Sequence, residues 1–172
     1  MACHVTIAFI HAAFLLNFPN LITQQGAGMS KSIAQILKLK GSDVWSIGSD
    51  ARVYDALALM AEKGVGALVV IDKDQVVGIF TERDHARKVD LEGRCSQKSF
   101  VRQVMSEDIC YVSLQVSVDE AMAIMTDKRC RHLPVMENDQ LVGLASIGDL
   151  VKASLDEKDF EIKQLKKYIK GE

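Results

Sequence analysis

The sequence predicts an α/β (α+β) fold in which two tandem copies of one small unit pack about a pseudo-twofold axis. The first observation is a repeat: residues 53–84 align without a gap onto residues 118–149, at a constant offset of 65, and 12 of the 32 positions are identical. Unrelated windows would share about two. The second observation is that both copies show the same succession of patterns: a short strand, a helix, a hairpin and a second helix.

The first copy carries recognisable start and stop signals. Ser49-Asp50 is a typical start for its first helix, along which apolar residues recur at helical spacing. Gly64 ends that helix, because glycine readily takes the left-handed conformation there. Thr81 opens a second helix. The expected elements are a helix over 53–61, strands over 67–71 and 75–80 around a turn at 72–74, and a helix from 81 onward.

The second copy repeats these patterns, with a helix over 118–125, strands over 133–136 and 140–145 around a turn at 137–139, and a helix opened by residues 146–149. Residues 31–45 supply a lead-in helix and strand, and residues 156–169 a final helix with one apolar side. A unit of about 50 residues cannot bury its own apolar face, so the copies should pack together and form two related clefts. The predicted division is an N-terminal extension (1–28), repeat one (29–90), a flexible linker (91–102), repeat two (103–155) and a C-terminal helix (156–172).

The first 28 residues differ in composition from the rest of the chain. They are almost wholly apolar from Val5 to Phe18, and no lysine or arginine precedes Lys31. The apolar run is short for a bilayer span, and the missing cations argue against a secretory signal and a mitochondrial transit peptide. Two interpretations stay open. Residues 1–28 are an upstream extension from a mis-called start before Met29, or they are a membrane-seeking or export segment.

Composition argues against several classes of function. The formal net charge is −2, and the basic residues form no stripe that would suit nucleic acid. The four cysteines lie far apart, which indicates reduced thiols, and neither they nor the four histidines have metal-ligand spacing. Cys130 lies among arginines and is a candidate for a lowered thiol pKa. The sequence contains no nucleophile-elbow, P-loop or zinc-protease motif. We expect no catalytic residues, metal, nucleic acid or membrane partner.

One pattern occurs at equivalent places in both copies, at 78–84 and 143–149: glycine, two apolar residues, a hydroxyl, two free positions and an aspartate. Thr81 with Asp84, and Ser146 with Asp149, have the spacing of a helix capping box, in which the carboxylate also complements the helix dipole. A hydroxyl and a carboxylate at a helix start also suit ribose hydroxyls, and the helix end attracts phosphate. Both interpretations stay open for each pair.

The segment before each hairpin differs between the copies. Copy one has Gly64-Val-Gly66-Ala67, and its glycines let a ligand lie against the backbone. Copy two has Arg129-Cys-Arg131-His132 at the matching place, and these cations and donors suit phosphate. Arg83 of copy one is matched by Gly148 in copy two. The clefts are therefore predicted to be unequal, one binding tightly and the other weakly or not at all.

Together these features resemble the CBS-domain family, specifically a tandem CBS pair (a Bateman module) of the small stand-alone type. The resemblance covers roughly residues 30–155 and is carried by the repeated glycine–hydroxyl–aspartate pattern, by residues 81–88, by Arg131-His-Leu-Pro-Val135 and by residues 146–152. It implies a βαββα fold for each repeat and dimerisation with a second copy. It also implies an adenosine ligand: AMP, ADP, ATP or NAD(H), with S-adenosylmethionine ranked below them.

The resemblance further implies roles for residues of this chain. Asp84 and Asp149 would bind ribose, while Thr81 and Ser146 would contact ribose or phosphate. Phosphate would be held by Arg83, Arg131 and His132, and adenine framed by Ile47, Val65, Ala67, Val112 and Pro134. The full set of predicted nucleotide-binding residues is Ile47, Val65, Gly66, Ala67, Thr81, Arg83, Asp84, Val112, Arg129, Arg131, His132, Pro134, Ser146, Gly148 and Asp149.

Three functions follow in order of preference. The first is a regulatory, non-catalytic adenine-nucleotide sensor that acts on an unknown partner protein or on its own homodimer. The second is an interaction or scaffold protein that keeps the fold with empty clefts. An enzyme comes third, because two copies of the unit leave no room for a catalytic barrel. The expected location is the cytoplasm, or the mitochondrial matrix in a eukaryote.

Overall fold

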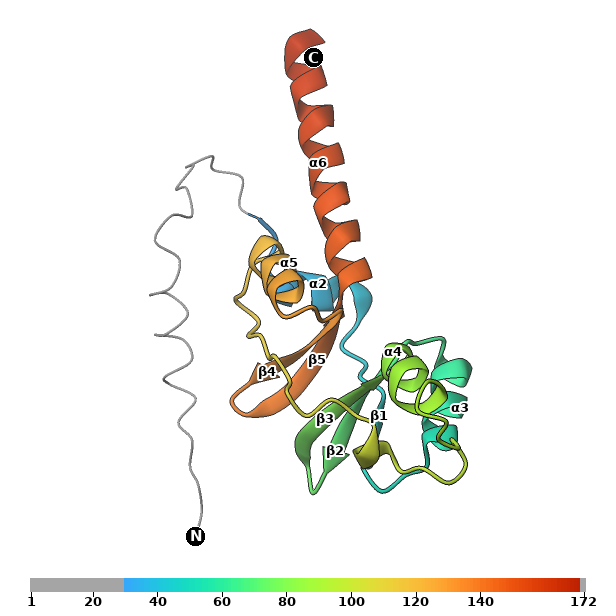
Figure 1. Ribbon diagram of the computed structural model, residues 1–172. Helices are drawn as coiled ribbons and strands as arrows, with labels where there is room; N and C mark the ends of the chain where they lie inside the picture. The colour runs from blue at the N-terminus through green and yellow to red at the C-terminus, as the bar shows by residue number, and fades with distance from the viewer. Residues whose placement is uncertain (1–29, 171–172) are drawn as a thin grey trace.

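The computed structural model describes residues 30–170, so the expectations for residues 1–28 lie outside the described part of the chain. The predicted order of elements occurs twice (Figure 1). The first repeat contains β1 (Ser46–Ile47), α3 (Val53–Lys63), β2 (Ala67–Asp72), β3 (Gln75–Thr81) and α4 (Glu82–His85), which continues into the π-helical turn η1 (Ala86–Asp90). The second contains α5 (Val118–Asp127), β4 (His132–Glu137), β5 (Gln140–Ser146) and α6 (Ile147–Lys170). α2 (Ile33–Lys40) precedes the first repeat, and the 3-10 helix η2 (Val101–Gln103) precedes the second.

The two hairpins have the same register at the offset of 65. Ala67 pairs with Thr81 in β2–β3, and His132 pairs with Ser146 in β4–β5. Both hairpins shift register at equivalent positions, and both turn through two residues with positive φ. A two-residue turn of this kind matches the right-handed twist of the flanking strands. The predicted hairpins are therefore confirmed in both repeats.

A short parallel strand precedes the helix in each repeat. Ile47 of β1 lies beside Val70, and Val112 lies beside Val135, again at the offset of 65. The first sheet has the order β1-β2-β3, whereas in the second Val112 forms a single bridge at the edge of β4-β5. The βαββα order and the mixed helix-and-strand fold class are thus present in both repeats.

The lead-in segments cross between the repeats. α2 precedes the first repeat in the chain, yet Ile33 and Leu37 are buried in the second repeat's core with Leu133 and Leu150. The Ile33 N–H donates to the carbonyl oxygen of Val116 (2.9 Å). The structure therefore differs from the predicted unit 29–90, because α2 belongs by packing to the second repeat.

The predicted linker 91–102 supplies the matching segment for the first repeat. Val101 and Val104 are fully buried in that repeat's core, and the Val53 N–H donates to the carbonyl oxygen of Ser99 (3.0 Å). The end of this segment is therefore part of a core and not a flexible connection. The exchange has a simple physical reason: each small unit buries more apolar surface when a neighbouring segment covers it.

The glycine that opens the repeated pattern makes room for these crossing segments. A Cβ atom at Gly143 would collide with the side chain of Leu37, and one at Gly78 with the side chain of Met105. The same residue type is needed twice because each hairpin is covered closely by a lead-in segment.

α3 has its predicted start but not its predicted start signal, and α6 differs from its predicted bounds. α3 begins at Val53 with no side-chain cap, and Ser49, the expected start signal, instead donates its N–H to Asp72 Oδ1 (3.0 Å). The predicted end at Gly64 is confirmed, with φ of 64°. The second helix of repeat two and the expected C-terminal helix are one continuous helix, α6, of 24 residues. No proline and no glycine follows Gly148 before Gly171, so nothing in the sequence breaks this helix.

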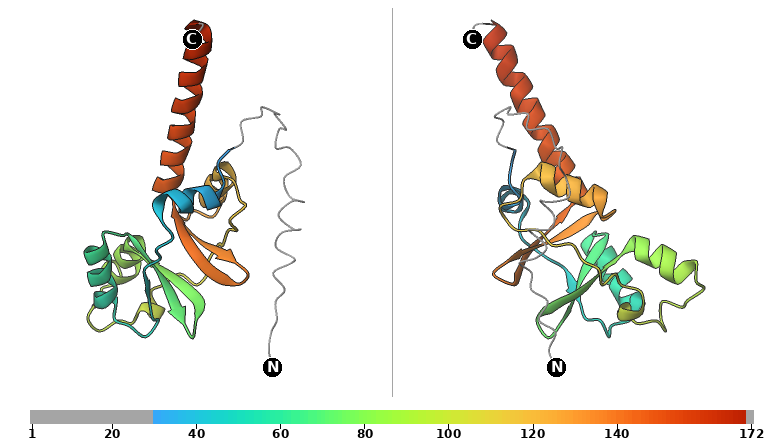
Figure 2. Two further views of the ribbon diagram at one scale, coloured as in Figure 1. Left: turned by 180° about the vertical axis from the view of Figure 1, so that it is seen from behind. Right: turned by 60° about the vertical axis from the view of Figure 1, so that its left-hand side comes forward.

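α6 extends well beyond the two repeats. Both views in Figure 2 show its C-terminal part standing away from the sheets and from the shorter helices. Within residues 30–170, no helix is both long and apolar enough to cross a membrane. The same residues contain no group of three or more His, Cys, Asp or Glu side chains placed to hold a metal ion.

Candidate functional site

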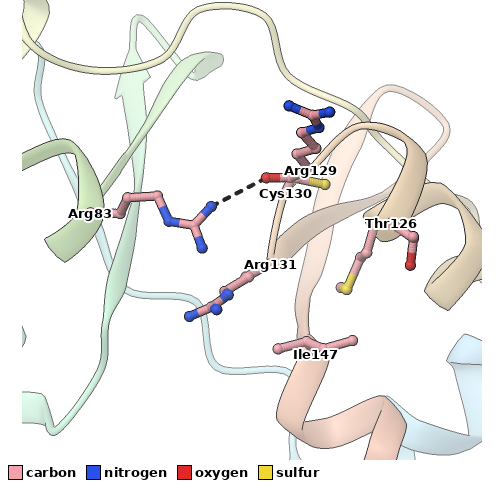
Figure 3. Close-up of a pocket in the computed structure, with 7 residues that line it drawn as sticks. Arg83, Thr126, Arg129, Cys130, Arg131 and Ile147 are labelled. Carbon is pink, nitrogen blue, oxygen red and sulfur yellow. Dashed lines mark hydrogen bonds between the residues drawn. The ribbon is translucent and has the colours of Figure 1, made fainter. Parts of the chain in front are cut away.

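A cavity of about 290 Å³ lies where the two repeats meet, and it is open to solvent. Arg83 reaches it from α4 of the first repeat, and its guanidinium donates to the carbonyl oxygen of Arg129 in the second (3.4 Å; Figure 3). Its volume is close to the lower end of the range for small-molecule sites, about 300 Å³. The lining residues are Arg83, Met125, Thr126, Arg129, Cys130, Arg131 and Ile147.

The cavity carries a concentrated positive charge. Three of its seven lining residues are arginines, and none is acidic. In Figure 3 the side chains of Arg83 and Arg131 approach the same gap from different repeats, whereas the side chain of Arg129 extends away from them. Guanidinium groups stay charged at any physiological pH and bind phosphate through paired N–H donors. The arrangement is chemically suited to an anion that bridges the two repeats.

Asp84 caps α4 and is enclosed by donors. Its Oδ2 accepts from the backbone N–H of Thr81 (3.1 Å) and from the Thr81 hydroxyl (2.6 Å), and its own N–H donates to that hydroxyl. Its Oδ1 accepts from the Ser106 hydroxyl and from the Lys88 ammonium, both at 3.0 Å. The side chain is only 12% exposed. Both carboxylate oxygens are therefore occupied by groups of the protein itself.

Asp149 has the same cap at the start of α6 but a more open side chain. Its Oδ2 accepts from the backbone N–H (2.9 Å) and hydroxyl (2.7 Å) of Ser146 and from the Lys40 ammonium (2.7 Å). Burial raises the pKa of Asp149, but the hydrogen bonds from Lys40 and Ser146 outweigh it and hold the pKa below its usual value. Among the described residues none donates to Oδ1, and the side chain is 26% exposed.

His132 lies next to Arg131 at the start of β4. Burial is the main reason why its pKa lies below the usual 6.5, and the charges of Lys40 and Arg131 lower it further. The carboxylates of Asp149 and Glu82 act in the opposite direction. Since the pKa of His132 is lowered, the ring is neutral at pH 7 and offers one N–H donor rather than a positive charge.

The first repeat has the opposite charge at the equivalent positions. Gly64 and Gly66 stand where the second repeat has Arg129 and Arg131, and Glu82 stands where it has Ile147. The Glu82 N–H donates to the Gly66 carbonyl oxygen (3.2 Å), and the Ile147 N–H makes the matching bond to Arg131 (2.9 Å).

The Glu82 side chain lies close to the backbone of Gly66. A Cβ atom at Gly66 would lie 3.3 Å from Glu82 Oε2, so the carboxylate rests against the backbone where the predicted ligand would lie. The two equivalent positions, which the sequence predicts to be unequal, therefore differ in the sign of their charge.

The structure brings together only part of the predicted site. Arg83, Arg129 and Arg131 line one cavity, but none of the residues assigned to adenine does. Those lie on the strands or against the cores: Ala67, Val112 and Pro134 are buried, and Ile47 and Val65 are half-buried and pack against the core of the first repeat. Gly148 is exposed and directly follows Ile147, which lines the cavity.

Four lining residues were missed by the sequence analysis: Met125, Thr126, Cys130 and Ile147. Met125 is only 2% exposed and belongs to the second core as well. All four lie close in sequence to predicted site residues, Arg129 or Ser146. This closeness is the sequence feature from which they could have been predicted. The expected lowering of the Cys130 pKa is wrong: burial raises it, and the nearby Cys110 adds to the rise.

Comparisons with known proteins agree with this fold. The CBS domain family model matches residues 37–84 and 101–156. The mitochondrial CBS domain-containing protein CBSX3 of Arabidopsis thaliana is 38% identical over 152 residues, which cover 83% of this chain and 73% of that protein. A solved structure from Burkholderia ambifaria, described as that of a signal-transduction protein with CBS domains, is 49% identical. It has a TM-score of 0.72 and covers 73% of this chain and 95% of its own.

A more distant structure, the hexameric CBS-CP12 protein of bloom-forming cyanobacteria, is 28% identical with a TM-score of 0.65, over 72% of this chain and 68% of that one. The duplicated βαββα unit and the repeated capping pattern define a module built from two tandem CBS repeats. The chain belongs to the CBS-domain family, and its similarity is to the small stand-alone members.

Proposed function

We propose that this protein is a regulatory module that binds one adenine nucleotide per chain, with its phosphates in the cavity between the repeats. The observation that carries the proposal is the cavity lining: it contains three arginines and no carboxylate, and the side chains of Arg83 and Arg131 approach the same gap from the two repeats. AMP, ADP, ATP and NAD(H) all carry the phosphates that such a site would bind. S-adenosylmethionine has no phosphate and is expected to bind most weakly.

The ribose is assigned to Asp149 rather than Asp84. The Asp84 carboxylate already accepts from Thr81, Ser106 and Lys88, and displacing these donors would cost stability. Asp149 Oδ1 has no such donor among residues 30–170, and its α6 begins at the cavity wall. The negative charge of Glu82 would repel phosphate, so we propose that the first repeat binds no nucleotide. Only the position in the second repeat would be filled.

A bridging ligand also provides a means of regulation. Arg83 belongs to the first repeat and Arg129 and Arg131 to the second, so a bound phosphate would hold the repeats in one relative position. We propose that this position is read by an as yet unknown protein partner or by a second copy of the chain, and that no reaction is catalysed. We further propose that the protein forms a homodimer. Its proposed location is the cytoplasm, or the mitochondrial matrix in a eukaryote.

Calorimetric titration of AMP, ADP, ATP, NADH and S-adenosylmethionine into the full chain tests the proposal. Arg131→Ala should weaken the best nucleotide by roughly 10- to 150-fold, the range for losing hydrogen bonds to a charged group. Arg87→Ala is the matched control, because Arg87 is exposed and does not line the cavity. Equal losses in both variants would refute the site. No heat from any of the five compounds at millimolar concentration would leave the scaffold function.

A further inference from the structure

The C-terminal part of α6 carries an apolar stripe that no described part of the chain covers. The exposed side chains on it range from 43% for Val151 to 82% for Ile169. Their spacing follows the alternating steps of four and three residues of a heptad repeat, in which a and d positions form one seam. The seam positions are Val151, Leu155, Lys158, Ile162, Leu165 and Ile169.

The charges on this part of α6 are divided between its two halves. Its first half, residues 156–161, holds four acidic residues: Asp156, Glu157, Asp159 and Glu161. Its second half, residues 162–170, holds four lysines and no acidic residue: Lys163, Lys166, Lys167 and Lys170. A helix with this division is complementary to a second copy of itself that runs in the opposite direction.

We propose that α6 pairs with α6 of a second copy as an antiparallel two-stranded coiled coil, with Ile162 of one copy facing Leu165 of the other. In this register the paired seam runs from Lys158 to Ile169 of each copy, and Val151 and Leu155 lie outside it. This arrangement is closed by a twofold axis, so each copy presents the same surface. It places Asp159, at an e position, beside the second copy's Lys166. The repeats lie at opposite ends of the paired helices, where they do not collide, because α6 projects away from them (Figure 1).

The antiparallel direction follows from the seam as well as from the charges. In a parallel pair, Lys158 would face the second copy's Lys158 inside the seam, and the two acidic halves would lie side by side. In the antiparallel pair, Lys158 faces the second copy's Ile169 near the end of the seam, where its ammonium reaches water. A second copy is therefore a better occupant than an unrelated helix, which would have to match both halves.

This interface is additional to any contact between the repeats and does not depend on nucleotide binding. The first experiment measures the mass of the full chain in solution by sedimentation. Ile162→Lys should raise the dissociation constant of the helix pair at least about 100-fold and so halve the mass, because each pair loses two buried isoleucines. Phe160→Lys is the matched control: Phe160 is 63% exposed on the same helix but lies outside the seam. Equal masses for the two variants overturn the proposal.

A second experiment tests the direction of the helices. Asp159→Lys should weaken association by about 3- to 10-fold, and adding Lys166→Asp to it should restore association, because the two charges then exchange places. In a parallel pair Lys166 would instead lie beside the second copy's Glu161. Weakening by Glu161→Lys, with no effect of Asp159→Lys, therefore refutes the antiparallel arrangement.

Discussion

Residues 64–66 and 129–131 occupy the same place in the two repeats but differ in chemistry. The backbone is shared: the N–H of Glu82 bonds to Gly66, and the N–H of Ile147 bonds to Arg131. The side chains differ, with two glycines and a carboxylate in one repeat against two arginines and an isoleucine in the other. The duplicated fold supplies two equivalent positions, and the side chains make only one of them attractive to an anion.

Replacing the arginines of the second repeat by the glycines of the first should have the largest effect on nucleotide affinity. Arg129→Gly/Arg131→Gly gives the second cleft the glycines of the first. Nucleotide affinity should fall by about 3 kcal/mol, roughly 150-fold, because the charge-assisted contact of Arg131 and the nearby positive charge of Arg129 are both removed. Calorimetric titration measures the loss. Affinity within a factor of five of the unaltered chain would contradict the role of this segment.

Substitution of the two hairpin glycines, Gly78 and Gly143, should lower the stability of the protein by different amounts. Gly143→Ala places a methyl group against the branched end of Leu37 and should cost about 2–3 kcal/mol, at the upper end for overpacking. Gly78→Ala meets Met105, an unbranched and flexible side chain that can move aside, and should cost about 1 kcal/mol. Urea unfolding of both variants gives the free energies of unfolding. A larger loss of unfolding free energy for Gly78→Ala than for Gly143→Ala would contradict this account of how the lead-in segments pack on the hairpins.

The sequence was sufficient for the repeat, because the offset of 65 is visible in the residues themselves. Gly64 and the two hairpin turns were predictable because each has a local cause, a left-handed residue or a tight two-residue turn. The crossing of α2 into the second repeat was not, since Ile33 and Leu37 have the same apolar pattern whichever core they join. Only packing between segments far apart in the sequence determines which core α2 joins.

Some features of the candidate site were predictable from the sequence and others were not. Arg83, Arg129 and Arg131 were identified from charge and from their place in the repeat, and the structure brings them to one cavity. The difference between Asp84 and Asp149 could not be foreseen, because Ser106 and Lys40, which bond to them, lie 22 and 109 residues away in the chain.

The two capping aspartates should therefore respond differently to substitution. Asp84→Ala should lower stability by about 2 kcal/mol, the upper end for a cap, and leave nucleotide affinity unchanged. Asp149→Ala should cost about 1 kcal/mol of stability and also weaken nucleotide binding by about 1.5 kcal/mol, roughly 10-fold. Thermal unfolding and calorimetric titration of each variant, at a temperature where it is folded, separate the two quantities. If Asp84→Ala weakens binding as much as Asp149→Ala, the ribose assignment is wrong.

The smallest effect is expected at His132, which has Ala67 as its counterpart in the first repeat. Because burial holds the pKa of His132 below 6.5, the folded state favours the neutral ring. This stabilisation is present above pH 6.5 and is lost as the pH falls through the lowered pKa, since the unfolded chain then binds the proton more readily.

A bound phosphate should act on His132 in the opposite direction, because it favours the charged ring. Lowering the pH from 8 to 5.5 should therefore destabilise the free protein while strengthening nucleotide binding. His132→Gln should reduce both changes, because glutamine keeps an N–H donor and does not titrate. Unfolding and titration at the two pH values, on both proteins, provide the check. A nucleotide affinity whose pH dependence is the same in His132→Gln as in the unaltered chain would place His132 outside the phosphate site.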